Sequence, residues 1–267
     1  MESIAVMYLC RFGNPHRFSR RFLESLIRFD AGAKYDLVYI LKGFPSGQSD
    51  LSFLNLRCRL PCASSEVRVS DDLFITSAHL EGADQVAHEM VLPLTSWSEV
   101  LAEHWLARFV SAYNTVKNCE IVGATGSYEG IETAPFPNIH IRTTAFFMDR
   151  KIFLRAERGP LKTKWDNNLM EAGPNGLTKQ VLARNKVALV VGRDSRVWEP
   201  LEWPQSQTFR SGDQQNLLIS DNRTHDYEVG SYKARRKLTH LAWRDPTLAM
   251  RPALSRRLYS ALRWKFL

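Results

Sequence analysis

GADQVAHEMVLPLTSWSEVLAEHWL, residues 82–106, places an apolar run directly before a helical pattern, with a short hydroxyl-rich turn between them. The apolar run, His88–Leu94, predicts a strand that is buried on both faces. Beyond the turn, apolar residues such as Leu101 and Trp105 recur at helical spacing, which predicts a helix over Val100–Tyr113. A buried strand that leads into an amphipathic helix is typical of a parallel sheet covered by helices.

The same alternation continues on both sides of this segment. Further strands are expected at Ile4–Leu9, Leu37–Leu41, Val67–Val69, Glu120–Val122, Thr143–Met148 and Ala188–Val191, and further helices at Phe18–Phe29, Ile75–Gln85, Arg150–Ala156 and Leu177–Ala183. The sequence therefore predicts an α/β domain over residues 1–230, with one mostly parallel, Rossmann-type nucleotide-binding sheet and helices on both faces. The mixed aromatic and polar residues of 198–224 indicate a loop-rich lid or edge, and 231–267 reads as a basic amphipathic helical tail.

The composition is that of an ordinary globular protein, because 44% of the 267 residues are hydrophobic and 24% are charged. No apolar run approaches the roughly 20 residues of a membrane span, and the apolar stretch near the N-terminus is too short for a signal-peptide core. The four cysteines form no paired motif and have no histidine cluster beside them, so free thiols are expected. These features predict a cytoplasmic protein without a zinc site.

The net charge of +8 gathers in residues 231–267, where Asp245 is the only acid. Two interpretations of this tail stay open. It is either a terminal helix packed on the domain with solvated cations, or a peripheral contact with an anionic membrane, such as the inner face of a cell membrane. Nucleic acid is not an expected partner, since no recognition motif accompanies the charge.

Parallel sheets bind ligands at the carboxyl ends of their strands, so side chains at and just after those ends are the first candidates for chemistry. The candidates at these ends are Tyr8, Arg11, Lys42, Asp71, Asp72, Thr95, Ser96 and Ser98. The family resemblance described below implies that they bind a donor or nucleotide. The two aspartates end a short strand, and either a solvated turn or a helix cap would also explain them.

A second group of polar residues follows the strand at 120–122. The glycines of 123–129 allow close backbone approach to a ligand, although a plain turn is the alternative. His140 and Arg142 flank Ile141, so on a strand they share one face. Residues 209–224 concentrate amides and charges, which a lid or an ordinary polar loop would explain equally. The candidates for contacts with an acceptor or diphosphate are Ser127, Glu129, His140, Arg142, Thr143, Arg210, Gln214, Asn216, Asp221 and Asn222.

The order of these motifs resembles the GT-A fold of glycosyltransferases, in particular the inverting family-2 pattern and a bacterial subgroup associated with surface polysaccharide. The resemblance covers about residues 3–224 and rests on residues 82–106, on IHIRTTAFFMDRKIFL (Ile139–Leu154) and on MEAGPNGLTKQVLARNKVALVVG (Met170–Gly192). It implies transfer of a sugar from a nucleotide diphosphate donor to a glycan or lipid-linked acceptor. It also implies Glu171 as the catalytic base, with Arg142, Arg210 or Arg223 stabilising the leaving diphosphate.

The sequence departs from that family where an Asp-x-Asp motif is expected, because residues 95–98 read Thr-Ser-Trp-Ser. Hydroxyls are poor ligands for a hard cation such as Mg²⁺ or Mn²⁺. Three outcomes follow: transfer without a metal, recruitment of Asp71 or Asp72 as metal ligands, or a catalytically degenerate relative that binds a glycan or partner. Outside the resemblance, Glu171 would read as an acid at the start of a helix, where it complements the macrodipole.

Overall fold

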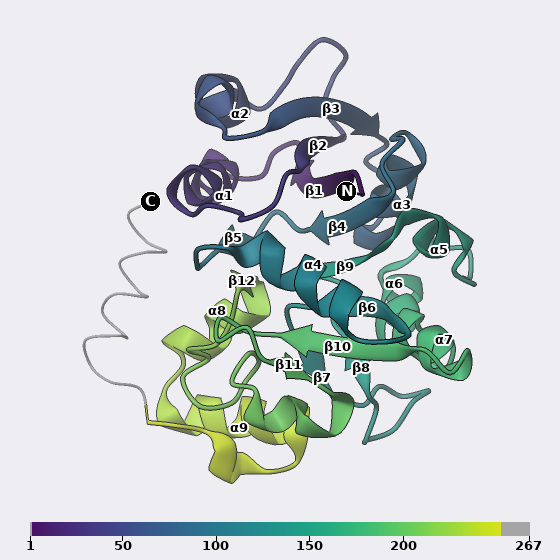
Figure 1. Cartoon of the computed structure of the whole chain (residues 1–267), viewed down its shortest axis with the longest axis vertical. Helices are drawn as coiled ribbons and strands as arrows, with labels where there is room; N and C mark the ends of the chain where they lie inside the picture. Colours follow the sequence, from purple (N-terminus) through teal and green to yellow (C-terminus); the bar gives the residue numbers. More distant parts are fainter. Residues whose placement is uncertain (1, 252–267) are drawn as a thin grey trace.

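The computed structural model describes residues 2–251. Strand β1 is buried along almost its whole length and lies inside an eight-stranded sheet. The strand order is β11-β10-β6-β9-β4-β1-β2-β3, which Figure 1 shows from the lower to the upper part of the molecule. The strands of this sheet are β1 (Ile4–Arg11), β2 (Asp36–Lys42), β3 (Ala63–Val69), β4 (Met90–Leu94), β6 (Cys119–Gly123), β9 (Phe146–Asp149), β10 (Val187–Val191) and β11 (Val197–Trp198).

Strands β3, β2, β1 and β4 pair in parallel, as do β6 and β10. Strand β9 joins these two groups by pairing antiparallel with both β4 and β6, and β11 adds an antiparallel edge to β10. The carboxyl ends of the parallel strands therefore all lie on the same side of the sheet. We call this side the carboxyl edge, and the side where the strands begin the opposite or amino-terminal edge. The predicted fold class, a mostly parallel α/β sheet, is confirmed.

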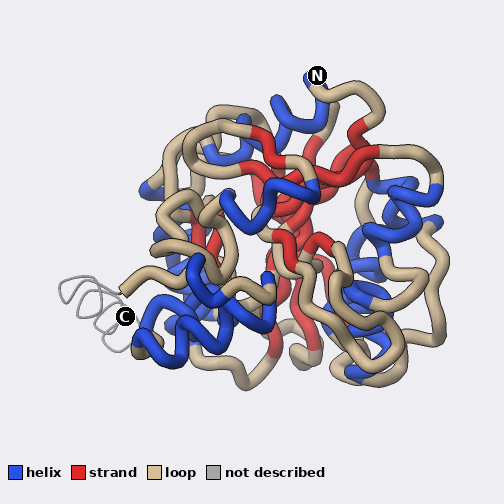
Figure 2. The backbone as a smooth tube through the Cα atoms, turned by 90° about the horizontal axis from the view of Figure 1, so that it is seen from below, coloured by secondary structure: helices blue, strands red, loops and turns tan. Residues whose placement is uncertain are grey.

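Helices cover both faces of the sheet, as Figure 2 shows. The core on one face takes apolar side chains from α1, α2 and α4, and the core on the other takes them from α3, α5, α6, α7 and α9. The helices are α1 (His16–Arg28), α2 (Leu51–Leu56), α3 (Ile75–Asp84), α4 (Trp105–Thr115), α5 (Arg150–Arg155), α6 (Lys164–Ala172), α7 (Leu177–Ala183), α8 (Asn222–Val229) and α9 (Tyr232–Trp243), with 3₁₀ turns η1 (Arg57–Arg59), η2 (Pro200–Gln205) and η3 (Pro246–Leu248). None of the helices in residues 2–251 has the length and apolar character needed to cross a bilayer.

Helix α4 starts later than the expected Val100. Residues Glu99–Val100 form a short strand, β5, that pairs antiparallel with β12, Ile219–Ser220. The amide of Val100 also donates to the Ser25 hydroxyl, and His104, at φ 54°, turns the chain into the helix. The β5–β12 pair fixes residues 219–220 beside the segment that follows β4.

Helix α6 was not expected from the sequence, and it changes the local setting of Glu171. Thr163 and Asp166 form a reciprocal capping box at its start. Glu171 consequently lies in the last turn of α6 rather than at the start of a helix, so the macrodipole interpretation of this residue is wrong.

Residues 198–224 are part of the packed body, which favours the edge over the lid among the two interpretations of this stretch. Trp203, Phe209 and Leu217 in this stretch are buried. Helix α9 packs on the same body, because the Trp243 indole donates to the Phe209 carbonyl and buried Arg235 pairs with Asp213. Residues 252–267 of the predicted tail lie outside the described residues. Membrane contact through them stays a prediction that vesicle flotation of the full chain would test.

Close packing of Gly126 gives a first test of the fold. Gly126–Ser127 forms β7, which pairs with β8, His140–Ile141. A Cβ at Gly126 would lie 2.3 Å from Cε3 of the fully buried Trp203. We expect Gly126→Ala to lower the free energy of unfolding by about 1–3 kcal/mol through overpacking, as measured by chemical denaturation. Gly159→Ala is the control, because its Cβ would meet nothing within 4 Å. Equal stability of the two variants would contradict this packing.

Candidate functional site

The carboxyl ends of β1, β2 and β3 bring together two cations and an aspartate. Arg11 Nε and Nη2 donate to the two carboxylate oxygens of Asp71 at 2.8 and 2.9 Å. The Lys42 ammonium donates to Asp71 Oδ1 at 2.7 Å. Hydrogen bonds from Arg11 and then Lys42 hold the pKa of Asp71 well below its usual range. In this Arg11–Lys42–Asp71 cluster, Arg11 and Asp71 are about half exposed and the Lys42 side chain is 8% exposed, so Arg11 is the cation that a phosphate group can contact directly.

The hydroxyl-rich turn after β4 is closed on itself. The Thr95 amide donates to Ser98 Oγ at 3.0 Å, and Ser98 is fully buried. Ser96 donates to the Leu9 carbonyl, and Tyr8 donates to the Ser96 carbonyl at 3.0 Å. These side chains hold the turn against β1. Their donor set has no carboxylate, so it does not fit a hard divalent cation.

A cavity of 260 Å³ lies beyond β6 and is lined by several of the remaining candidates. It is lined by residues from the segment after β6, from the end of α6, from residues 209–210 and from α8 and α9. The charged and polar lining residues are Glu129, His140, Arg142, Asn168, Glu171, Arg210 and Arg223. We call this the Glu171 cavity. Ser98, one of the donor or nucleotide candidates, is not among its lining residues.

The Glu171 carboxylate is held by Thr143. Glu171 Oε2 accepts from the Thr143 amide at 2.7 Å and from the Thr143 hydroxyl at 2.6 Å. A carboxylate in the last turn of a helix meets the negative end of the macrodipole, which is unfavourable. The two Thr143 hydrogen bonds offset this cost and orient the carboxylate.

The burial of His140 favours its neutral imidazole form. Burial lowers the pKa of His140, and the nearby Glu171 carboxylate only partly opposes that shift. Nδ1 lies 2.7 Å from the Asn138 carbonyl, which can only accept, so Nδ1 carries the proton. Nε2 of the neutral ring is therefore an acceptor.

Two buried arginines flank Phe209. Arg142 Nη1 pairs with Asp221 at 2.6 Å, and Arg210 Nη1 pairs with Glu129 at 2.9 Å. Both guanidinium carbons lie over the Phe209 ring, at 4.6 and 4.8 Å from its centroid. Asp221 also caps α8, because its carboxylate accepts from the Thr224 amide. These contacts fix two cations beside Glu171.

Five other candidates have local contacts or positions outside the cavity lining. Ser127 accepts from the Glu129 amide, and Asp72 accepts from Ser70 in an exposed turn. Gln214 bridges the Arg210 amide and the Thr224 carbonyl, and Asn216 donates to the Ser206 carbonyl. Asn222 is the first residue of α8. These contacts favour a structural role for the five residues rather than direct contact with a ligand.

No protein-family model and no curated protein matches the sequence. Among solved structures, residues 1–349 of TarS from S. aureus are similar, with a TM-score of 0.52 and 11% identity, over 99% of this chain and 73% of that one. The mannosyltransferase PcManGT from Pyrobaculum calidifontis, solved with GDP-Man and Mn²⁺, has a TM-score of 0.51 and 11% identity, over 98% of this chain and 70% of that one. Both are glycosyltransferases. The fold is GT-A-like.

The GT-A-like sheet has a second cavity at its carboxyl edge that the sequence analysis missed. Its volume is 660 Å³, and Arg11, Phe12 and Phe44 are among its lining residues. The two rings meet edge to face, with centroids 5.4 Å apart, and Phe12 is 51% exposed. An aromatic residue directly after a strand, in Arg11-Phe12 and again in Gly43-Phe44, is the signal that could have found this cavity.

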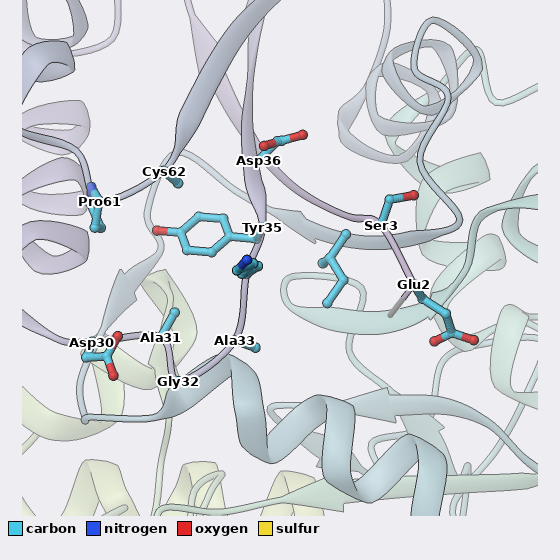
Figure 3. A pocket seen from close by; sticks show the side chains of 12 residues that line it. Glu2, Ser3, Asp30, Ala31, Gly32, Ala33, Tyr35, Asp36, Pro61 and Cys62 are labelled. Atoms are coloured by element: carbon cyan, nitrogen blue, oxygen red, sulfur yellow. The ribbon is translucent and has the colours of Figure 1, made fainter.

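A larger cavity of 810 Å³ lies at the opposite edge of the GT-A-like sheet (Figure 3). Its lining residues, including Ser3, Tyr35 and Cys62, come just before β1, β2 and β3 begin. Ligands of parallel sheets bind at the carboxyl ends of strands, and this cavity lies at the amino ends. The position of the larger cavity therefore argues against it as the ligand site, although it exceeds the Glu171 cavity in volume.

Proposed function

We propose that this chain transfers a sugar from a nucleotide diphosphate donor to the hydroxyl of an acceptor. The observation that supports it is the Glu171 carboxylate, oriented by Thr143 beside His140 and Arg142 in a GT-A-like fold. A positioned carboxylate can accept the hydroxyl proton as the new bond forms.

In the proposed reaction, the donor lies along the carboxyl edge of the sheet. The nucleotide end occupies the cavity beside Phe12 and Phe44, and the Arg11–Lys42–Asp71 cluster meets its phosphates. Neighbouring strands are about 4.8 Å apart, so β2 and β6 are separated by about 19 Å along this edge. The sugar of a bound donor follows its diphosphate, so it would point from Arg11 along this edge toward the Glu171 cavity.

At the Glu171 cavity, the acceptor oxygen forms a bond to the anomeric carbon while the bond from that carbon to the phosphate oxygen breaks. Glu171 takes the hydroxyl proton, and the nucleotide diphosphate leaves as an anion. A single base that acts on the incoming hydroxyl supports inversion at the anomeric carbon. The resemblance to the polysaccharide-associated subgroup supports a glycan or lipid-linked acceptor.

The closed turn at Thr95–Ser98 favours one alternative. In this alternative, the chain binds a donor or glycan but does not catalyse sugar transfer. Binding of a nucleotide diphosphate with no sugar transfer under any metal condition would support that alternative.

Thermal unfolding with nucleotide diphosphates tests donor binding. We expect UDP, GDP or dTDP at about 100 times its dissociation constant to stabilise the chain by about 2.7 kcal/mol, or on the order of 5 °C. The shift should persist in EDTA, because Arg11 and Lys42 supply the positive charge. Lys42→Gln should reduce the shift. Lys34→Gln should not, because Lys34 lies before β2 begins and lines the opposite edge. Absence of any nucleotide shift, or a shift that needs Mn²⁺, would contradict this account.

A further inference from the structure

Two guanidinium groups in the Glu171 cavity are buried, and that of Arg210 is only partly satisfied. The Arg142 and Arg210 side chains are 9% and 4% exposed. Each forms a hydrogen bond to one carboxylate, Asp221 for Arg142 and Glu129 for Arg210. A guanidinium has five N–H donors, and Nε of Arg210 has no partner within residues 2–251. Buried donors are nearly always paired in folded proteins, so this cavity has unused capacity for an oxygen-rich ligand.

The Arg210 side chain is fixed in place before any ligand binds. Its backbone has φ 46°, a left-handed conformation that costs a residue with a Cβ on the order of 1–3 kcal/mol. The Gln214 side chain holds this conformation, because its Oε1 accepts from the Arg210 amide and its Nε2 donates to the Thr224 carbonyl. The surrounding structure therefore maintains a strained backbone that directs a cation to the cavity.

The charges of the cavity affect its two buried arginines differently. Burial alone would lower the pKa of Arg142, but Asp221 and then Glu171 raise it. Arg210 is compensated less. Burial lowers the pKa of Arg210, and Arg142 and Arg223 lower it further, while Glu129 opposes the shift. A phosphate or carboxylate group that bridges the guanidiniums would relieve this repulsion and take two or more N–H donors at once. The cavity thus fits an oxyanion.

The size of the cavity indicates which substrate carries that oxyanion. Its 260 Å³ falls below the roughly 300–1,000 Å³ of sites for drug-sized ligands, so it holds a fragment of about one sugar unit rather than a whole nucleotide sugar. Glu171 lines the same cavity. In the proposed reaction Glu171 is the base, and the substrate that contacts it is the acceptor. We propose that the acceptor unit carries a phosphate or carboxylate group, which Arg142 and Arg210 bind beside the hydroxyl that Glu171 deprotonates. This inference rests on the proposed function.

Binding of glucose 6-phosphate, with glucose as the uncharged comparison, tests the inference in titrations of the full chain at low salt. We expect the wild-type chain to bind the phosphate ester more tightly than glucose. Arg210→Gln should weaken that binding about tenfold or more. Glu129→Gln should strengthen it, because it frees Arg210 Nη1 and removes a competing charge. A purely structural role of the pair would not give these opposite signs.

Arg196→Gln is the matched control, because Arg196 also pairs with a glutamate, Glu202, and lies over an aromatic ring, Trp198, but outside the cavity. Its phosphate-ester binding should equal that of the wild type. Equal loss in Arg196→Gln and Arg210→Gln, weaker binding in Glu129→Gln, or no preference for the phosphate ester would overturn the inference.

Parallel titrations with UDP or GDP separate this inference from the proposed function. If the oxyanion belonged to the donor, Arg210→Gln would weaken nucleotide binding by the same factor, which would contradict the acceptor assignment. If no nucleotide diphosphate bound while the phosphate ester behaved as expected, the transfer reaction would fail and the anion site would stand.

Discussion

Glu171→Gln should lower the rate of sugar transfer by about 10²–10⁴-fold, the range that general acid–base catalysis contributes. Glutamine keeps the size of the side chain and can still accept from the Thr143 amide and hydroxyl. It cannot take a proton from the acceptor. Thermal shifts with nucleotide diphosphates should be unchanged, because the donor cluster at Arg11, Lys42 and Asp71 does not include Glu171. The measurement is initial-rate transfer at saturating donor.

The control for this variant is Glu132→Gln. Glu132 is an exposed acid that follows two residues of the cavity lining, Gly130 and Ile131. Its replacement should leave the transfer rate within about twofold, since general acid–base catalysis needs a group within hydrogen-bond reach of the proton. Transfer by Glu171→Gln at the wild-type rate would remove Glu171 from the reaction.

Asp221→Ala should destabilise the chain by about 3–5 kcal/mol, because it leaves the buried Arg142 guanidinium without its carboxylate. It also removes the cap of α8. Arg142→Met should be similarly harmful, since Asp221 is then a buried carboxylate without a cation. The double variant should lose less stability than the sum of the single losses, because neither charge is left unpaired.

Chemical denaturation of the four proteins in this cycle measures the coupling. The exposed pair Arg196–Glu202 gives the comparison, and a cycle there should show about 1 kcal/mol or less. Strict additivity of the Asp221 and Arg142 changes would contradict a buried, mutually dependent pair.

The stability that Asp221 contributes should also depend on pH. Burial alone would raise the pKa of Asp221, but the Arg142 guanidinium and the Thr224 amide outweigh burial and lower it. A carboxyl with a lowered folded-state pKa stabilises the fold fully above its unfolded pKa, and that stabilisation is lost as pH falls through the folded value. The stability difference between wild type and Asp221→Ala should therefore shrink below about pH 4.

The alternation of strands and helices was predictable from the sequence because burial leaves a local pattern. Leu37–Leu41 is uniformly apolar and became a strand buried on both faces, and residues 18–29 repeat at helical spacing and became α1. His140, Arg142 and Glu171 line one cavity, but Glu171 comes from α6, a helix that the sequence analysis did not predict.

Long-range contacts are what the sequence could not reveal. Residues 219–220 pair with β5, which lies more than a hundred positions earlier in the chain. No local sequence pattern predicts that pairing. The closed turn around Ser98 depends on contacts between β1 and the end of β4. Helix α6 was missed although its capping signal, Thr163 with Asp166, was present, because few apolar residues mark its buried face.

A crystal structure of the chain with a bound nucleotide diphosphate sugar tests the central claim most directly. We expect the nucleotide beside Phe12 and Phe44, the phosphates near Arg11 and Lys42, and the anomeric carbon facing the Glu171 cavity. A donor bound at the amino-terminal edge, in the cavity beside Tyr35, or a sugar held away from Glu171 would contradict the proposed transfer.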